Sequence, residues 1–368
     1  MYAAFRETDI RVLRCPWMRN LSLSRKGLIM FRIVTLFVSF FQMLLEYAWG
    51  YGSLPNHLSY EERELARKFK RACREARQNT IMWACVCDYA GDDPAFAKVK
   101  QALVAHWKKY CMFSETRVPN FDTLACSYDG LTQLLAKFRH LPRGLVGFLN
   151  VAPIAKHTAD KRNGNHPFYA VLLTNGRILF SPNSGYSLSL LRPYIVAVVR
   201  IPCAQNGEQF RSWQCFPEEA AKILRGDFRN VDAVFGPNGA HQIPEVPETA
   251  FARSDNYGNI KVRFTVKDAV RFGWKDGDII SIHVDGECVG RAVYGKNVHG
   301  HEGETLLSLA AGSGIIQADA SSEPEVHLDM FKVWGNAMEI LGSPNFEQIV
   351  ELRQETHAHA PRRERVTA

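Results

Sequence analysis

The segment from Thr80 to Val151 alternates between short apolar runs and amphipathic helical patterns, and this order constrains the fold more than any other feature. The apolar runs at 80–87 and 145–151 are continuous and bounded, as in strands that are buried on both faces. Helical patterns at 95–107 and 123–138 lie between them. Because strands that alternate with helices pair in parallel, we predict an α/β domain with a mostly parallel central sheet flanked by helices.

After residue 250 the sequence changes to short strands with two-residue alternation. The run from Ile260 to Lys267 alternates apolar and polar side chains without a break, which predicts a strand with one buried face. A second alternating run, 278–284, is followed by the turn Asp285-Gly286 and a returning strand at 288–294. These hairpins predict a C-terminal all-β, barrel-like domain.

Helix-start and turn signals divide the chain further. Ser59 followed by Glu62 predicts a capped, mixed-charge helix over 58–78, whose charges are typical of a solvated face. A stretch rich in proline and glycine after the α/β segment predicts a linker. The predicted organisation is an N-terminal extension at 1–57, an α/β domain at 58–230, a linker at 231–250, a β-barrel domain at 251–345 and a C-terminal tail at 346–368.

The net charge of +7 is concentrated at the N-terminus. Residues 1–32 carry seven basic and two acidic side chains, which accounts for +5 of that total, so we predict no nucleic-acid partner. The apolar run 33–45 is short for a membrane span. It fits a signal sequence, a docking helix or an extension that does not fold. We expect a cytoplasmic protein, with secretion or a membrane partner only if residues 27–49 act as a signal or anchor.

The nine cysteines are dispersed and include no CxxC pair. An odd, scattered set favours reduced thiols that serve as small core residues. Cys85 and Cys87 alternate within an apolar run, which indicates strand packing rather than metal ligation. We predict no metal site and no cofactor.

The polar turn 254–260 places Asp255 four residues before Asn259, at the start of the alternating strand. A carboxylate and a carboxamide at this spacing offer hydrogen-bonding groups to one small polar ligand. Turns also favour Asp, Asn and Gly for their own backbone geometry. The sequence leaves both interpretations open.

Asp88 begins an acidic, glycine-containing loop, 88–94, directly after the first apolar run. Carboxylates before a helix stabilise its positive N-terminal end, which is one explanation of this loop. Open α/β sheets also bind ligands at the carboxyl ends of their strands, and this position makes Asp88 a candidate binding residue.

Five segments, in their order along the chain, resemble the family of S-adenosylmethionine-dependent halogenases and hydroxide adenosyltransferases, which has the fluorinase/chlorinase fold. The resemblance covers residues 80–342. The segments are 88–94 (Asp-Tyr-Ala-Gly-Asp-Asp-Pro), 118–122 (Val-Pro-Asn-Phe-Asp), 181–185 (Ser-Pro-Asn-Ser-Gly), 254–260 (Ser-Asp-Asn-Tyr-Gly-Asn-Ile) and 311–314 (Ala-Gly-Ser-Gly).

The resemblance implies a sugar-binding set in the α/β domain. Asp88 would hold both ribose hydroxyls, since one carboxylate accepts two hydrogen bonds from a vicinal diol. Phe121 would line the sugar and its 5′-carbon. Asn183 lies in the segment that is similar to the family's Pro-Asp/Asn-Asn-Gly turn.

The resemblance also implies a set in the β domain. Asp255 would bind the methionine ammonium, and Asn259 would bind the polar edge of adenine. The backbone groups of Gly312 and Ser313, on a predicted loop, would also bind adenine. Tyr294 would stack on the base.

The chain departs from the family where water would be activated. Family hydrolases carry Asp-Pro-Gly-Val-Gly after the third strand, whereas this chain reads Ala-Pro-Ile-Ala-Lys from Ala152. A family histidine in Phe-His-Gly-Arg-Asp has no counterpart in 210–214, where Ser212 resembles the serine of the halogenases. His157 and Ser212 are therefore the candidate catalytic residues. The alternatives are a solvated loop histidine at 157, which is the simpler explanation there, and a serine at 212 that caps the following helix.

The resemblance implies substitution at the 5′-carbon of S-adenosylmethionine. We expect an enzyme that cleaves S-adenosylmethionine with water to adenosine and methionine. The alternative is a catalytically inactive protein that binds S-adenosylmethionine or adenosine, and a halide adenosyltransferase is third. The family assembles as trimers that bind the ligand between neighbouring subunits, so we expect a homotrimer in which Asp88 and Asp255 around one ligand come from different chains.

Overall fold

The computed structural model describes residues 54–89, 93–136, 142–152, 166–203, 210–295, 306–317, 321–345 and 348–355. All of these described residues belong to one compact unit. Within the described ranges, no helix combines the length and apolar character that crossing a membrane requires.

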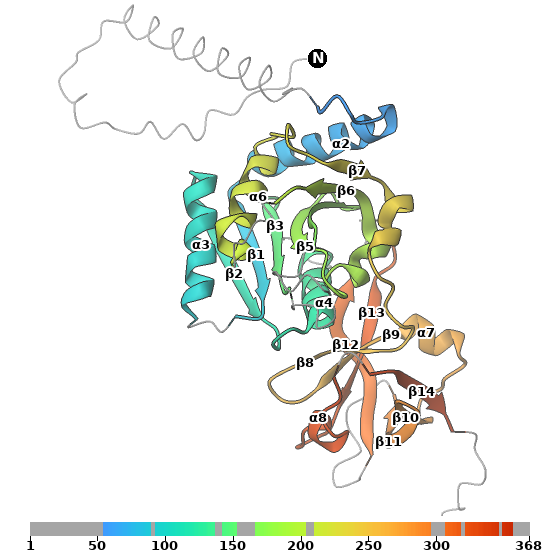
Figure 1. The fold of residues 1–368 in the computed structure, drawn as a ribbon. Coiled ribbons are helices and arrows are strands. Elements are labelled where there is room, and N and C mark those ends of the chain that lie inside the picture. The colour runs from blue at the N-terminus through green and yellow to red at the C-terminus, as the bar shows by residue number, and fades with distance from the viewer. Residues whose placement is uncertain are drawn as a thin grey trace, which may run out of the picture. The chain divides into compact units, whose positions relative to one another are not determined.

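The first sheet has seven strands in the order β2-β1-β3-β5-β4-β6-β7 (Figure 1). Its strands are β1 (Ile81–Cys87), β2 (Cys111–Arg117), β3 (Leu145–Asn150), β4 (Phe168–Leu173), β5 (Ile178–Pro182), β6 (Ile195–Ile201) and β7 (Ala233–Phe235). The helices around it are α2 (Tyr60–Arg77), α3 (Pro94–Trp107), α4 (Thr123–Leu134), α5 (Arg211–Gln214), α6 (Phe216–Leu224) and the 3-10 helices η2 (Ser189–Tyr194) and η3 (Pro237–Gln242).

Helices cover both faces of this sheet, as the sequence predicts. α2, α3 and α6 pack on one face through a core that contains Phe69, Trp83 and Phe148. α4 and the two 3-10 helices cover the other face, where Leu131 packs in the same core as Leu149. Every residue of β3, β4 and β5 is buried, which explains why their sequences are largely apolar.

The prediction of a mostly parallel central sheet is not confirmed, because the sheet is mixed. β1 pairs in parallel with β2 and β3, and β3 pairs in parallel with β5. β4 is antiparallel to β5 and β6, and β7 is antiparallel to β6. The turn at Asn175-Gly176 causes the first reversal, since Gly176 takes a φ of +80° and a tight hairpin can join only antiparallel strands.

The second sheet also has seven strands, in the order β14-β10-β11-β12-β13-β9-β8, and it curls into a half-barrel (Figure 1). Only β11 and β12 pair in parallel among its described strands. Its elements are β8 (Phe251–Ser254), β9 (Ile260–Thr265), α7 (Val266–Arg271), β10 (Ile279–Val284), β11 (Glu287–Tyr294), β12 (Leu307–Ile316), β13 (Glu325–Phe331), α8 (Ala337–Ile340) and β14 (Val350–Gln354).

Three predicted boundaries differ from the structure. The predicted linker 231–250 contains β7 and η3, and the predicted tail 346–368 contributes β14, which pairs with β10. The alternating run expected to reach Lys267 ends as a strand at Thr265. There Thr265 and Asp268 form a capping box that starts α7, so local capping overrides the alternation.

Two other sequence predictions have clear outcomes. The predicted capping box of the first helix is confirmed, because Ser59 accepts from the Glu62 amide and Glu62 accepts from the Ser59 amide. The prediction that the cysteines are reduced is wrong for Cys203 and Cys215, which form a disulfide. The chain folds back after β6 and brings α5 next to the end of that strand, a contact that sequence spacing does not reveal.

Candidate functional site

The first group of candidate residues lies at the carboxyl end of β1. Asp88 directly follows the strand, and its Oδ2 accepts a hydrogen bond of 3.1 Å from the Phe121 amide. Phe121 has a φ of +64°, and its side chain is 59% exposed. Burial raises the pKa of Asp88, and the Phe121 amide opposes this rise.

A short polar network lies beside Asp88. The hydroxyls of Tyr89 and Ser212 share a hydrogen bond of 2.9 Å, and Tyr89 also bonds to the Asn150 side chain at the end of β3. Ser212 is buried on α5, with 8% of its surface exposed. Because burial raises the pKa of Tyr89, its hydroxyl keeps its proton at neutral pH. Two hydroxyls and an amide therefore meet next to a carboxylate at one strand end.

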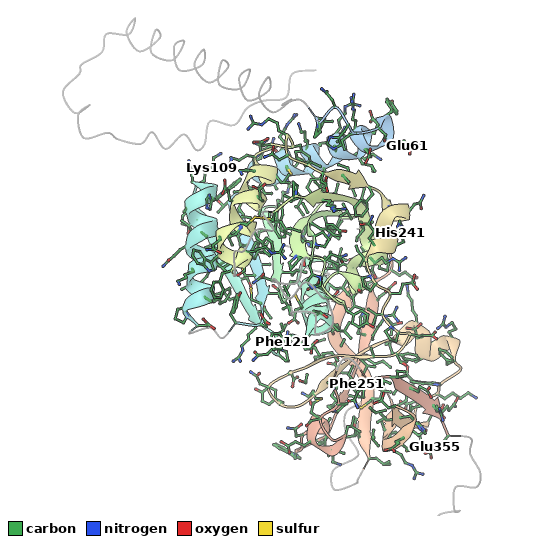
Figure 2. All side chains as sticks on the ribbon, in the orientation of Figure 1. Glu61, Lys109, Phe121, His241, Phe251 and Glu355 are labelled. Carbon is green, nitrogen blue, oxygen red and sulfur yellow. A yellow bond between two sulfur atoms is a disulfide. The ribbon has the colours of Figure 1, made fainter. Side chains whose placement is uncertain are left out.

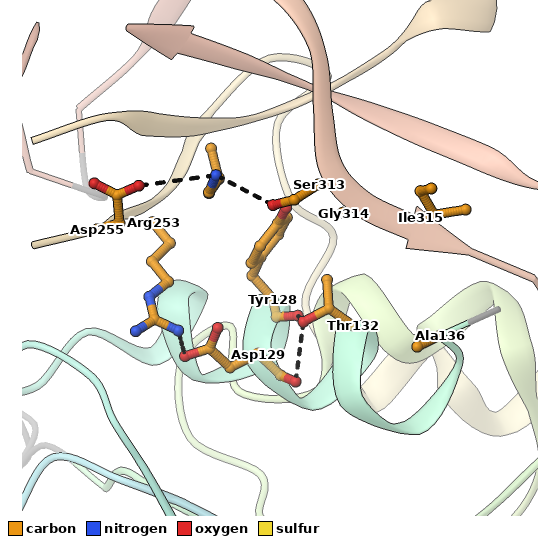
Figure 3. A pocket seen from close by; sticks show the side chains of 10 residues that line it. Tyr128, Asp129, Thr132, Ala136, Arg253, Asp255, Ser313, Gly314 and Ile315 are labelled. Atoms are coloured by element: carbon orange, nitrogen blue, oxygen red, sulfur yellow. Dashed lines mark hydrogen bonds and ion pairs between the residues drawn. The ribbon is translucent and has the colours of Figure 1, made fainter. Parts of the chain in front are cut away.

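The second group lines a pocket of about 460 Å³ between α4 and the half-barrel (Figure 3). α4 supplies one wall, and β8, β9 and β12 supply the other. The lining residues are Tyr128, Asp129, Thr132, Ala136, Arg253, Asp255, Lys261, Ser313, Gly314 and Ile315. Its ionic side chains lie at one end and Ala136 and Ile315 at the other (Figure 3), so the pocket suits a molecule with a charged head and an apolar part.

Two ion pairs hold the charged end of the pocket. Arg253 on β8 pairs with Asp129 on α4, and Lys261 on β9 pairs with Asp329 on β13. Burial raises the pKa of Asp129 to about 6, although the Arg253 guanidinium opposes this rise. Asp129 is therefore mostly ionised at neutral pH and joins α4 to β8 of the half-barrel by a charged contact.

The polar side chains of the predicted turn at 254–260 form hydrogen bonds mostly within the turn itself. Asp255 Oδ1 accepts from the amides of Tyr257 and Asn259, and Asp255 Oδ2 accepts from the Asn259 side chain at 2.9 Å. Lys261 Nζ lies 4.0 Å from the same Oδ2. The two predicted ligand-binding side chains thus contact each other, and Asp255 reaches the pocket while Asn259 supports it.

α8 holds this turn in place through Gly258. The Gly258 carbonyl accepts from the Met338 amide at 3.1 Å, and Gly258 takes a φ of +77°. A Cβ at this position would lie 1.9 Å from Asn336 Oδ1, which caps α8 by accepting from the Glu339 amide. The backbone at Gly258 therefore has no room for a side chain.

Gly258→Ala is expected to lower the free energy of unfolding by about 2–3 kcal/mol, because it combines a left-handed backbone with a steric clash. Chemical denaturation followed by circular dichroism measures this change. Gly286→Ala is the matched control, since Gly286 also has a positive φ of +87° but no heavy atom within 4 Å of the place that a Cβ would take. Equal destabilisation by the two variants would contradict the proposed packing of α8.

The predicted loop around Gly312 and Ser313 is part of strand β12 instead. A Cβ on Gly312 would lie 2.1 Å from Asp329 Oδ1, and a Cβ on Gly314 would lie 2.3 Å from Tyr128 Oη. The glycines therefore let β12 approach its neighbours closely, which accounts for this motif without a ligand. Ser313 Oγ lies 3.5 Å from Lys261 Nζ at the pocket.

Two further predicted residues, Asn183 and Tyr294, form no hydrogen bond with either group in the described ranges. Asn183 donates from its side chain to the Gln242 carbonyl at 2.9 Å. The Tyr294 ring packs edge-on against Trp274, with 5.5 Å between centroids, beside the core of the half-barrel. His157 lies outside the described residues. In the described ranges, no three His, Cys, Asp or Glu side chains are grouped so that they could hold a metal ion.

Several residues of these groups were not predicted from the sequence. Asn150 is the polar end of an apolar run, and that contrast is a usable signal. Arg253 and Lys261 flank the predicted turn, so charge next to a candidate carboxylate is a second signal. Asp129 sits within a helical pattern and carries no such signal, because only the tertiary structure brings it to Arg253.

Comparisons with known proteins support the fold. No family model and no curated protein matches the chain. An uncharacterized conserved protein from Thermotoga maritima has a similar structure, with a TM-score of 0.55 and 14% identity, over 74% of this chain and 100% of that chain. A conserved hypothetical protein from Thermus thermophilus is similar with a TM-score of 0.50 and 17% identity, over 74% of this chain and 100% of that chain. At these identities the likeness concerns the fold alone.

Proposed function

We propose that the protein binds S-adenosylmethionine at the end of β1 and cleaves it with water at the 5′-carbon, giving adenosine and methionine. The observation that carries this proposal is the Asp88 carboxylate, which accepts a hydrogen bond from the Phe121 amide and adjoins the Tyr89–Ser212 hydroxyl pair. A half-buried carboxylate with spare acceptor capacity suits a vicinal diol, which donates two parallel hydrogen bonds.

The hydroxyl network has the chemistry to orient a nucleophile. In the proposed reaction the water oxygen forms a bond to the 5′-carbon while the bond from that carbon to the sulfonium breaks. Methionine leaves as a neutral thioether, and the proton of the attacking water passes to solvent. Because the sulfonium is already a good leaving group, positioning and desolvation of the water by Tyr89, Ser212 and Asn150 supply the catalysis.

The amino-acid end of the ligand is assigned to the pocket beside Asp255 as part of the same proposal. Asp255 would accept from the ammonium, and the charged end near Arg253 and Lys261 would attract the carboxylate. Within one chain's described residues, Asp88 and Asp255 share no hydrogen-bond partner. A homotrimer that places the two carboxylates of neighbouring subunits around one ligand is therefore part of the proposal.

Binding without catalysis is the second candidate function, and two observations favour it. Ala152 follows β3 with an exposed methyl group, at the place where the resemblance implies a carboxylate. Ser212 is already bonded to Tyr89, which leaves its hydroxyl fewer free positions for water. A protein with this site would hold S-adenosylmethionine or adenosine and release it unchanged.

Product analysis separates the candidate reactions. The purified full chain is incubated with S-adenosylmethionine, with and without chloride, and the mixture is separated by chromatography. Adenosine and methionine in equal amounts are expected in both cases. Chloroadenosine would indicate a halide adenosyltransferase, and unchanged S-adenosylmethionine together with measurable binding would indicate the inactive protein.

The affinity for S-adenosylmethionine is expected to fall at acidic pH. Burial raises the pKa of Asp88, and only the ionised carboxylate accepts both ribose hydroxyls. The affinity should therefore be constant above this pKa and fall about tenfold per pH unit below it. Isothermal titration from neutral to acidic pH measures the profile. Asp88→Asn is the control. If its pH profile is identical to that of the native chain, the assignment of the ribose hydroxyls to Asp88 is wrong.

A further inference from the structure

The disulfide between Cys203 and Cys215 attaches the helix that carries Ser212. Cys203 is buried after β6, and Cys215 is partly exposed directly after α5. The Cys215 amide donates to the Arg211 carbonyl at 3.0 Å, so Cys215 continues the turn of α5. Ser212, which bonds to Tyr89, precedes Cys215 by three residues. Because residues at this spacing lie on the same side of a helix, the disulfide and the Ser212 hydroxyl share one face of α5.

α5 is too short to fix its own orientation. It spans only Arg211–Gln214, and Phe210 before it has no polar side chain that could cap its first turn. A single helical turn is unfavourable alone, because it fixes several backbone dihedrals for one hydrogen bond. The orientation of α5 therefore depends on its attachments to the domain, where α5 and α6 lie beside α3 (Figure 2). The Arg211 guanidinium donates to the His166 carbonyl at 3.2 Å, and the disulfide adds a covalent attachment three residues after Ser212.

Four buried cysteines in the α/β domain do not compete with this pair. Cys73, Cys85, Cys87 and Cys126 are fully buried, and burial raises the pKa of each thiol. Thiols that stay protonated are poor nucleophiles for disulfide exchange. A reductant in solution reaches the disulfide from the side of Cys215, which is partly exposed. Reduction therefore acts on the attachment of α5 without exchange of disulfides into the core.

We propose that the Cys203–Cys215 disulfide positions Ser212 against Tyr89, and that a dithiol reductant disrupts the candidate site by breaking this bond. The thiolate of the reductant attacks Cys215 Sγ, the bond between the two sulfurs breaks, and Cys203 leaves and takes up a proton. The second thiol of the reductant then closes its own disulfide and releases Cys215 as a thiol. Two electrons and two protons thus pass from the reductant to the cysteines. α5 loses its covalent attachment, turns about its axis and carries Ser212 away from Tyr89.

The effect on the position of α5 is measured without any substrate. The full chain is purified without reductant, and peptide mapping by mass spectrometry is expected to find Cys203 linked to Cys215. Hydrogen exchange then compares the chain with and without a dithiol. The amides of Trp213, Gln214 and Cys215 donate to carbonyls one turn earlier. Their exchange should become about tenfold faster after reduction, whereas the amides of β3 inside the sheet should not change.

Two variants assign this change to the disulfide. C203A/C215A should show the faster exchange in α5 both with and without the dithiol. C288S removes an exposed free thiol and should respond to the dithiol as the native chain does. Circular dichroism confirms that the reduced chain and both variants are folded. Free thiols at Cys203 and Cys215 in the untreated chain, or equal exchange of α5 before and after reduction, would overturn the proposal.

The effect on turnover rests on the proposed function. Reduction should lower kcat for S-adenosylmethionine cleavage about 10- to 100-fold, because Ser212 no longer orients the water, and reoxidation should restore it. KM should change by less than about twofold, since Asp88 does not lie on α5. In S212A, reduction should lower kcat by less than about twofold, because the group that the disulfide positions is already absent. The same loss on reduction in S212A as in the native chain would contradict the positioning role. Absence of cleavage by the oxidised native chain would contradict the proposed function alone, because hydrogen exchange still decides the position of α5.

Discussion

Asp88→Ala is expected to raise the Kd for S-adenosylmethionine by about 100-fold or more. Two charge-assisted hydrogen bonds to the ribose would be lost, each worth about 1.5–3 kcal/mol. Isothermal titration with the native chain and the variant measures the difference. Asp88→Asn should lie between them, because the carboxamide keeps one acceptor oxygen and loses the negative charge.

The fold should survive the Asp88→Ala substitution. The Phe121 amide loses its acceptor, but Phe121 is largely exposed, so water replaces the lost bond. Glu323→Ala is the matched control, since Glu323 is an exposed carboxylate that pairs loosely with Lys267 at 3.7 Å. If Asp88→Ala binds the ligand as tightly as Glu323→Ala does, the assignment of the site to the end of β1 is wrong.

Asp129→Ala is expected to destabilise the protein by about 3 kcal/mol, because it leaves the Arg253 guanidinium without its ionic partner between α4 and β8. The side chain of Asp129 is 6% exposed and that of Arg253 is 24% exposed, so solvent only partly compensates the loss. This change corresponds to a fall in Tm of about 6–12 °C. Thermal unfolding followed by circular dichroism measures it.

The double variant D129L/R253M is the control for the ion pair. It replaces both charges with apolar side chains, and such replacements of buried pairs are often neutral or stabilising. We expect its Tm to lie closer to that of the native chain than to that of Asp129→Ala. If the Tm of Asp129→Ala equals that of the native chain, the ion pair does not hold α4 and β8 together.

Most of the fold was predictable from local patterns. The buried strands β1 and β3, the helices between them and the capping box at Ser59 all follow from short-range periodicity and capping chemistry. The mixed pairing of the first sheet was not predicted, although the turn Asn175-Gly176 that causes it is a typical hairpin sequence. Periodicity identifies strands, whereas their direction depends on how long and how tight each connection is.

The candidate site was predicted only in part, for a physical reason. Asp88 and Asp255 stand out because each lies at the end of a strand beside a turn. Tyr89 and Ser212 lie far apart in the sequence, and their hydrogen bond depends on the chain returning through α5. Gly312 and Gly314 resembled a ligand-binding loop, but they are needed for the close approach of β12 to Asp329 and Tyr128. Sequence motifs do not distinguish these two uses of glycine.

Cleavage of S-adenosylmethionine in water enriched in heavy oxygen tests the central claim most directly. The full chain and Asp88→Ala are incubated with the substrate, and the products are examined by mass spectrometry. We expect the native chain to give adenosine that carries one heavy oxygen at its 5′-position together with unlabelled methionine, and Asp88→Ala to give at least about 100-fold less at low substrate concentration. Intact S-adenosylmethionine after incubation with the native chain, or labelled adenosine formed equally well by both proteins, would contradict the proposed function.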